Sequence, residues 1–413
     1  MAELERLTRL FRECLRGGWH AVEDNGRTAW AWSEGRAEIE APPGTVFLDL
    51  EMHSMYFAWT GRPQSVRVLV DGRLRGEHKV RNERHCIQVA CEGGARRVVL
   101  ECDALRPRDV DEGNNDSRVL GVCLSGMVPV TKETTLEEYF GQSLGYLDSS
   151  PELKRRYYYT LIGKEDEGEF LHGKIAEIRG ERLPSDPRGF RVLDCGAGTA
   201  GATVALARHG VRAVALDLSH WCLGAARVNA FLSGISFDLL RGDAQSLCFG
   251  DETFDVVLGL DIIEHVPDPG RMLREIRRVL KKDGLFIFRT GFGLNPSNIR
   301  RDPHYQTPFS VLLPRPIRAF YLSKVLGKAK ECELEDFVWF KTFGALRRFA
   351  GRCGLTTDLL EPDKMDESLA AAKRTRGPAT WPLRAMAAIL PRRCAQGVHA
   401  TCTDAYCVAR RRD

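Results

Sequence analysis

The segment "RVLDCGAGTAG" (residues 191–201) decides the fold. It begins as an apolar stretch typical of a buried strand and runs into Gly196-Ala-Gly198-Thr-Ala-Gly201, which has the spacing G-x-G-x-x-G. Glycines at these positions let the backbone turn sharply and let a ligand lie against it. The segment therefore predicts a strand, a tight turn and a helix, the opening of a doubly wound α/β domain.

The carboxylate of Asp194 stands two residues before the first of these glycines. In a dinucleotide-binding enzyme, a pyrophosphate would lie on the N-terminus of the following helix, where Asp194 would repel it. The same carboxylate suits a ligand that carries an ammonium and a sulfonium group. An NAD-linked oxidoreductase remains the alternative interpretation of the glycine spacing.

Two further acids follow at the ends of later strands. Asp217 closes the predicted strand "VRAVALD", where a carboxylate can accept hydrogen bonds from both hydroxyls of a ribose. Asp243, in "GDAQ", is placed to accept from an adenine amino group, with the Ala244 amide as the partner donor. Three acids at three successive strand ends favour an adenosine joined to an amino acid over NAD.

The wider sequence predicts two domains and a connector. Residues 1–130 read as a short amphipathic helix (1–16) and about seven short strands without an intervening helix, a pattern typical of a β-sandwich. Asp71-Gly72 is a hairpin signal within it. Residues 131–189 read as a helical connector or lid, and residues 190–413 as the α/β domain. In that domain, residues 269–283 predict an amphipathic helix with Gly284 as its C-cap.

Four segments in register carry a family resemblance: "VLDCGAGTAG", "VALDLS", "RGDAQSLCFGDETFDVVLGLDIIEHVPDP" and "LKKDGLFIFRT". They resemble the class I S-adenosylmethionine-dependent methyltransferases, in particular small-molecule enzymes with an E-H-V exit loop such as quinone-biosynthesis O-methyltransferases. The resemblance covers residues 155–300 well and 335–410 loosely. It implies a Rossmann-like seven-stranded sheet and S-adenosyl-L-methionine as the cofactor. Ala197 and Ala200 depart from the commonest family pattern but keep the turn small.

The resemblance also implies roles for individual residues. Asp194, Gly196 and Gly198 would hold the methionine part, Asp217 the ribose, and Asp243 with Ala244 the adenine. The full set predicted to bind the cofactor is Asp194, Gly196, Ala197, Gly198, Asp217, Leu218, Asp243, Ala244 and Leu260.

The acceptor site is predicted after the fourth strand of the α/β domain. His265 is the candidate catalytic base, because an imidazole titrates near neutrality, although it could equally only hydrogen-bond its own loop. Glu264, His304 and Tyr305 are predicted to contact the acceptor. The related quinone enzymes imply a divalent-ion role for Asp261, Glu264 and His265, but Asp261 stands where those enzymes carry a glutamate, and no metal is predicted.

Composition narrows the class of protein. The chain has 413 residues, a net charge of +4 and thirteen cysteines that are spread singly. The charge and the cysteines favour a cytoplasmic protein with reduced thiols and without a nucleic-acid partner. No run approaches the roughly 18 apolar residues that a membrane helix requires, so no membrane span is predicted. The predicted reaction is O-methylation of a small molecule or of a sugar or glycolipid intermediate; the oligomeric state is not predicted.

The N-terminal region faintly resembles carbohydrate-binding-like modules appended to bacterial glycosyltransferases, through Trp19, Trp30 and Trp32 and the closing "DSRVLGV". Exposed tryptophans stack on sugar faces, but tryptophans in a core are the commoner case. A glycan-proximal module and a plain docking module therefore both remain open. A non-catalytic glycan-binding or scaffold protein is the corresponding alternative for the whole chain.

Overall fold

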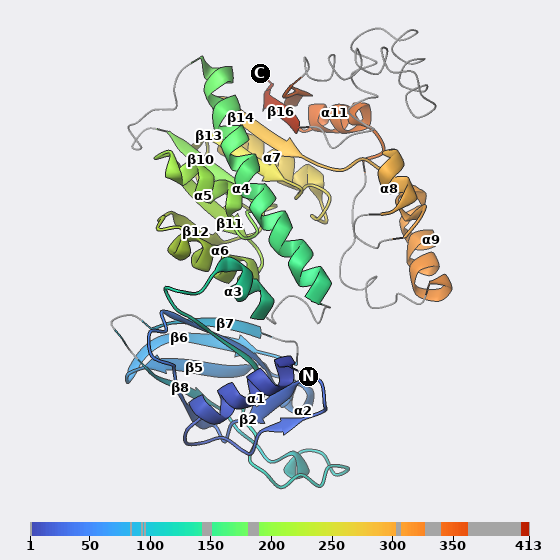
Figure 1. Ribbon diagram of the computed structural model, residues 1–413. Coiled ribbons are helices and arrows are strands. Elements are labelled where there is room, and N and C mark those ends of the chain that lie inside the picture. Colours follow the sequence, from blue (N-terminus) through green and yellow to red (C-terminus); the bar gives the residue numbers. More distant parts are fainter. Residues whose placement is uncertain are drawn as a thin grey trace. The chain divides into compact units, whose positions relative to one another are not determined.

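The computed structural model describes residues 2–82, 85–91, 94, 96–142, 151–180, 190–302, 307–326, 340–361 and 406–412 (Figure 1). Residue contacts divide the chain into two compact units. The first comprises Met1–Lys164 and His220–Ile235, and the second comprises Glu165–Ser219 and Ser236–Asp413.

The first unit is built on two antiparallel sheets. One has the order β1-β2-β9-β4-β7 and the other the order β3-β8-β5-β6. Their inner faces share one apolar cluster, to which Leu48 and Leu124 of the first sheet and Val66 and Leu100 of the second contribute. The strands are β1 (Glu23–Asp24), β2 (Ala29–Trp32), β3 (Arg36–Glu40), β4 (Phe47–His53), β5 (Gln64–Val70), β6 (Arg73–Val80), β7 (His85–Ala90), β8 (Arg97–Cys102) and β9 (Cys123–Val130).

Local sequence signals account for most of this unit. The helix α1 (Ala2–Cys14) buries Leu7 and Phe11 in the shared cluster. Asp71 and Gly72, both with positive φ, connect β5 to β6 as the hairpin signal predicted. The expectation of strands without a helix is wrong, because α2 (Tyr56–Thr60) and the single turn η2 (Pro107–Asp109) interrupt them.

Two helices cover part of the outer face of the five-stranded sheet. These are α3 (Leu136–Gln142) and α6 (His220–Leu232), whose Tyr139, Ala225 and Val228 form an apolar cluster with Val128 and Val130 of β9. This packing explains why α6 groups with the first unit.

A buried carboxylate lies in this outer layer. The hydroxyl of Tyr139 donates to Asp49 Oδ2 at 2.5 Å, and Gln88 accepts from Arg227 Nη1 at 2.7 Å while donating to the Gly224 carbonyl. Burial raises the pKa of Asp49 to about 6, against the lowering effect of its hydrogen bonds with Tyr139 and Gln88.

The second unit contains a seven-stranded sheet of order β12-β11-β10-β13-β14-β16-β15. β10 to β14 pair in parallel, whereas β16 runs antiparallel to both β14 and β15. The chain order reverses at β10, which has β11 on one side and β13 on the other, and such a switch point is where open α/β sheets bind ligands. The strands are β10 (Arg191–Cys195), β11 (Arg212–Asp217), β12 (Asp238–Arg241), β13 (Phe254–Leu260), β14 (Leu280–Arg289), β15 (Leu355–Leu359) and β16 (Tyr406–Arg411).

Helices cover both faces of this sheet. On one face, α5 (Gly201–Arg208) and the second-unit part of α4 (Pro151–Arg179) pack on Val192, Val256 and Ile287. On the other face, α7 (Pro269–Val279) and α11 (Phe343–Arg352) pack on a cluster that includes Val257 and Phe286. None of the described helices combines the length and hydropathy of a membrane span.

The helix α7 ends earlier than its amphipathic pattern predicted. It stops at Val279, and Leu280 already has extended backbone angles and is fully buried as the first residue of β14. Gly284 therefore lies inside β14, in an irregular stretch where the pairing passes from Phe254–Leu280 to Val256–Leu285. Burial of Leu280 in the sheet therefore ends the helix, although the sequence after Leu280 predicts that the helix continues.

We expect Asp49→Asn to stabilise the protein at alkaline pH. The raised pKa means that the folded state favours the neutral carboxyl, so wild-type stability is fully present at low pH and is lost as pH rises through about 6. Asparagine stays neutral and still accepts from Tyr139. The variant should gain up to about 3 kcal/mol over wild type, with the gain growing between about pH 4 and pH 6 and staying constant at higher pH.

The measurement is the difference in melting temperature between variant and wild type across that pH range. The exposed Asp109→Asn is the matched control and should show a flat difference. A flat difference for Asp49→Asn as well would contradict the assignment.

Candidate active site

The turn after β10 is built on left-handed backbone. Gly196, Gly198 and the non-glycine Ala200 all have positive φ. A Cβ on Gly196 would lie 2.3 Å from Ile262 Cδ1, so this position admits no side chain. A Cβ on Gly198 would meet nothing within 4 Å. The first glycine thus lets the turn pack on the loop after β13, and the second leaves open space above it.

Asp194 lies beneath this turn rather than at its surface. Its side chain is 2% exposed, and its Oδ2 accepts from Thr203 Oγ1 of α5 at 2.7 Å. The carboxylate thus ties β10 to the first helix and contributes negative charge from below the turn. Ala197, half-buried, donates its amide to the Leu216 carbonyl at 3.0 Å.

Asp217, the last residue of β11, holds the turn from the side. Its Oδ2 accepts from the Gly198 amide and its Oδ1 from the Ser219 amide, both at 2.8 Å. Burial raises the pKa of Asp217, while these backbone donors and the nearby His265 act in the opposite direction. The adjacent Leu218 is 62% exposed, an uncovered apolar side chain beside a carboxylate.

The loop after β12 presents a second carboxylate and a backbone donor. Asp243 accepts from the Gln245 amide at 2.8 Å and from its side-chain Nε2 at 3.1 Å. Gln245 Oε1 in turn accepts from the Asp268 amide at 2.9 Å, which links this loop to the start of α7. Ala244 is buried, and its amide donates no hydrogen bond within the described part of the chain.

The exit loop of β13 begins with a strained residue. Leu260 is buried at the strand end, and Asp261 follows with φ of 58°. Arg289, the last residue of β14, donates Nε to Asp261 Oδ1 at 2.9 Å and also pairs through Nη2 with the same carboxylate. A second ion pair joins Arg289 to Glu167 of α4. Asp261 is therefore engaged by an arginine.

Glu264 and His265 occupy opposite environments on this loop. Glu264 is buried, and its Oε2 accepts from Thr290 Oγ1 at 2.8 Å. Burial raises the pKa of Glu264 to about 7, and the charge of Asp261 adds to the rise while His265 opposes it. His265 is exposed, and its electrostatic effect reaches both Asp217 and Glu264.

The structure thus brings together the predicted residues from the ends of β10 to β13, whereas His304 and Tyr305 lie outside the described residues. Sequence reasoning missed Gln245, Arg289 and Thr290. Arg289 and Thr290 close the fifth parallel strand, at the same edge of the sheet as the acids, and that position was the signal that could have identified them. No set of three metal-ligating side chains suitable for an ion occurs among the described residues.

Comparison with known proteins identifies a family that the β10–β14 segment resembles. Residues 193–288 match the profile of a family described as "Methyltransferase domain". This segment is therefore similar to methyltransferase domains. S-adenosylmethionine, the predicted cofactor, is thereby confirmed.

Relatives of known name align with the same part of the chain. A phosphatidylethanolamine N-methyltransferase of Cereibacter sphaeroides is 37% identical over 128 residues, 30% of this chain and 63% of the relative. A ubiquinone biosynthesis O-methyltransferase of Ruegeria pomeroyi is 38% identical over 102 residues, 25% of this chain and 41% of the relative. The chain thus spans less than two thirds of the length of either relative.

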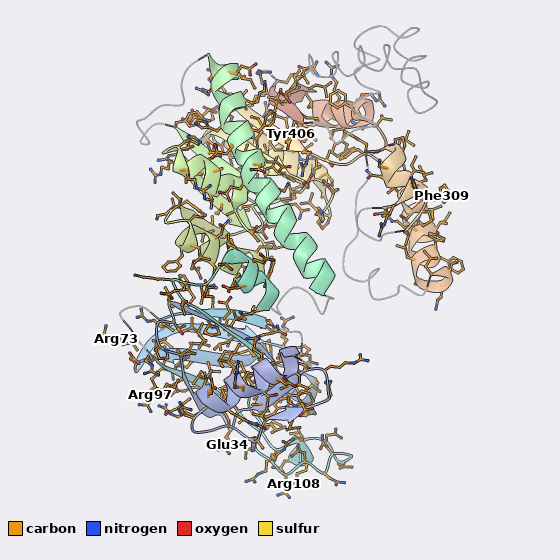
Figure 2. All side chains as sticks on the ribbon, in the orientation of Figure 1. Glu34, Arg73, Arg97, Arg108, Phe309 and Tyr406 are labelled. Atoms are coloured by element: carbon orange, nitrogen blue, oxygen red, sulfur yellow. The ribbon has the colours of Figure 1, made fainter. Side chains whose placement is uncertain are left out.

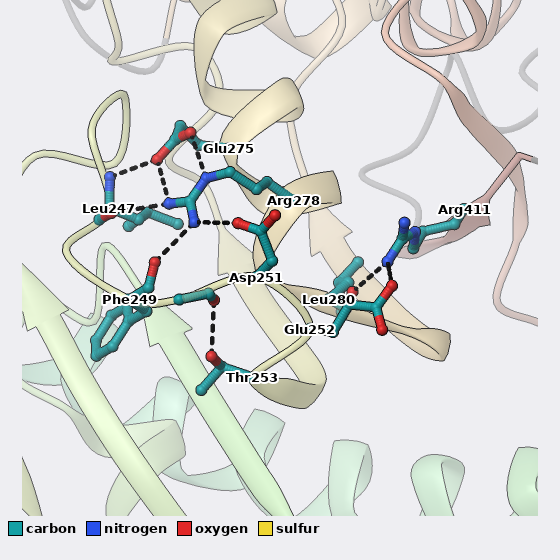
Figure 3. Close-up of polar contacts among 10 residues, drawn as sticks. Leu247, Phe249, Asp251, Glu252, Thr253, Glu275, Arg278, Leu280 and Arg411 are labelled. Atoms are coloured by element: carbon teal, nitrogen blue, oxygen red, sulfur yellow. Dashed lines mark hydrogen bonds and ion pairs between the residues drawn. The ribbon is translucent and has the colours of Figure 1, made fainter.

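One arginine braces the second unit behind the loop that carries Asp243 (Figure 3). Arg278 of α7 donates to the carbonyl oxygens of Leu247 and Phe249 at 2.9 and 2.7 Å and pairs with Asp251 and Glu275. Glu275 also accepts from the Leu247 amide at 2.8 Å. The loop between β12 and β13 is therefore fixed to α7 through Arg278 and Glu275.

We expect Arg278→Met to lower the stability of the second unit. Methionine retains the apolar stem but removes every donor to this loop, which should cost about 2 kcal/mol because two backbone carbonyls and two carboxylates lose a charged partner. Thermal unfolding measures the effect. Arg271→Met on the same helix, whose guanidinium is exposed, is the matched control. Equal melting temperatures for the two variants would contradict the bracing role.

Proposed function

We propose that this chain transfers a methyl group from S-adenosylmethionine to a nucleophile, an oxygen, on a small molecule. The observation that supports the proposal is the open space formed by the Gly198 turn, Asp217 with the exposed Leu218, and the Ala244 amide, which donates to no described residue. When bound, the cofactor supplies a methyl group that its sulfonium has already activated.

The residues fit a cofactor of this chemistry in three ways. The open space at Gly198 admits the methionine part close to the backbone, with the negative charge of Asp194 beneath it. Each oxygen of Asp217 accepts one backbone hydrogen bond and keeps lone-pair capacity for a ribose hydroxyl. Leu218 offers an apolar surface to the adenine ring, and Ala244 and Asp243 offer a donor and an acceptor to its edge.

The exit loop of β13 supplies the residues that would remove a proton from the acceptor. We assign His265 as the base that removes the acceptor's hydroxyl proton at an imidazole nitrogen, since it is exposed beside Asp217 and Glu264. The adjacent Glu264 accepts a hydrogen bond from Thr290, and its pKa is raised to about 7. Holding the acceptor in line is the larger contribution, on the order of 7–11 kcal/mol in well-oriented reactions.

A small-molecule acceptor is supported by the relatives named above, which are called a phosphatidylethanolamine N-methyltransferase and a ubiquinone biosynthesis O-methyltransferase. A sugar acceptor stays a prediction. Trp30 and Trp32 are half-buried, as is Trp19, whose indole nitrogen donates to the Glu38 carbonyl at 2.9 Å, so Trp19 is tied to its own sheets.

We expect Asp217→Ala to weaken cofactor binding by about 10- to 100-fold, because charged hydrogen bonds to the ribose and to the Gly198 amide are lost together. Calorimetric titration with S-adenosylhomocysteine measures the affinity, and a thermal melt shows that the variant is folded. Asp238→Ala, an exposed acid at the start of β12, should bind as wild type. Unchanged affinity in Asp217→Ala, or binding of NADH in place of the adenosine ligand, would count against the site.

We expect labelled S-adenosylmethionine and fractionated cell extract to yield a labelled small molecule with the wild-type protein. Glu264→Gln and His265→Ala should retain S-adenosylhomocysteine affinity but lose labelling, His265→Ala by about 100-fold or more, as removal of a general base predicts. Because the pKa of Glu264 is raised to about 7, its carboxyl ionises through that pH, and labelling by wild type should rise with pH there. If the protein binds the cofactor and a glycan array but labels no fraction, it is a scaffold rather than an enzyme.

A further inference from the structure

Large apolar side chains are concentrated on one short segment of the second unit. Of the eleven large hydrophobic residues that are exposed in the described part of the chain, six lie between residues 309 and 326. We call the four most exposed of them the apolar patch: Phe309 (59%), Ile317 (54%), Phe320 (62%) and Val325 (60%). Both exposed phenylalanines of the described residues belong to it.

The patch is carried by a packed scaffold. Its elements are α8 (Pro296–Arg300), η3 (Ser310–Leu312), α9 (Arg315–Phe320) and η4 (Tyr321–Val325). Val311 and Leu322 are buried on the inner side, and Lys341 Nζ donates to the Val311 carbonyl at 2.6 Å. The segment therefore buries one side and turns a second, apolar side to solvent.

Two hydrogen bonds bring the parts of the patch together. The Phe309 amide donates to the Ile299 carbonyl at 2.7 Å, which places Phe309 (Figure 2) beside the end of α8. The hydroxyl of Tyr321 donates to the carbonyl of Pro308 at 3.3 Å. Pro308 immediately precedes Phe309, so this bond brings the Phe309 segment beside the helical segment that carries Phe320.

The exposed charges among the described residues of this segment have one sign. Arg300 and Arg301 at the end of α8 and Lys324 in η4 are all exposed. Across residues 294–302 and 307–326 the acidic side chain is Asp302, which is fully buried and accepts from Ser310 Oγ at 2.6 Å. Exposed aromatic and aliphatic groups thus lie among cations without an exposed anion in these two described stretches.

We propose that this surface binds the interface of a lipid bilayer that contains anionic headgroups. Apolar side chains enter the boundary between headgroups and acyl chains, and arginine and lysine attract the anionic lipids. A second copy of the chain on the same patch would bring the arginines and lysines of both copies together, which is unfavourable. An anionic bilayer buries the apolar side chains and also pairs the cationic side chains with its headgroups.

Co-sedimentation of the full-length protein with vesicles tests this surface without cofactor or acceptor, so its outcome is independent of methyl transfer. We expect binding to vesicles of phosphatidylcholine with phosphatidylglycerol, weaker binding at high salt, and weaker binding to phosphatidylcholine alone. Phe309→Ser with Phe320→Ser should lower the partition coefficient about tenfold or more, since two large apolar groups no longer leave water. Arg300→Glu with Arg301→Glu should reduce binding to the anionic vesicles specifically.

The segment Arg73-Leu74-Arg75 of β6 supplies matched controls, because Leu74 is 54% exposed between two exposed arginines. Leu74→Ser, and Arg73→Glu with Arg75→Glu, should leave vesicle binding unchanged. Absence of wild-type binding to either vesicle, or control variants as weak as the patch variants, would overturn the proposal. A dimer in light scattering that Phe309→Ser with Phe320→Ser dissociates, without vesicle binding by wild type, would assign the patch to self-association instead.

Discussion

The bond between the Gly198 amide and Asp217 Oδ2 is the contact on which the candidate site depends. It joins the turn after β10 to the end of β11, and the Gly196 and Ala197 amides extend the link by donating to the Leu216 carbonyl. Three backbone donors thereby fix the turn against the neighbouring strand. The absence of a Cβ on Gly196 then lets Ile262 pack against it, so the exit loop of β13 is positioned from the same point.

This arrangement concentrates negative charge at one edge of the sheet. Asp194 and Asp217 reach that edge from β10 and β11 and Asp243 from the loop after β12, whereas Asp261 after β13 is paired with Arg289. Folding buries part of this charge against its own repulsion, and the raised pKa of Asp217 reflects the cost of burial. A ligand with positive charge lowers that cost, whereas a pyrophosphate would increase it. The charge pattern therefore discriminates between the two ligands that the glycine spacing alone admits.

Sequence reasoning was reliable where one local signal was sufficient. The G-x-G-x-x-G turn and the Asp71-Gly72 hairpin specify their own backbone, because few residues tolerate positive φ. The end of α7 could not be predicted, since the lysines and Asp283 after Leu280 continue a helical pattern while the burial of Leu280 in the sheet decides the outcome. The burial of Asp194 and the Gln245 bridge depend on residues distant in sequence, and spacing does not report such contacts.

The partners of Arg289 help to explain why the pKa of Glu264 is raised. Arg289 is committed to Asp261 and Glu167, and it also reaches the hydroxyl of Tyr406 at 3.3 Å. Glu264 lies three residues from Asp261 in the chain, but its own partner is the neutral hydroxyl of Thr290. A hydroxyl compensates a buried carboxylate far less than a guanidinium does, so burial and the charge of Asp261 raise the pKa of Glu264 to about 7. An arginine directed at Glu264 would instead have stabilised the ionised carboxylate and lowered its pKa.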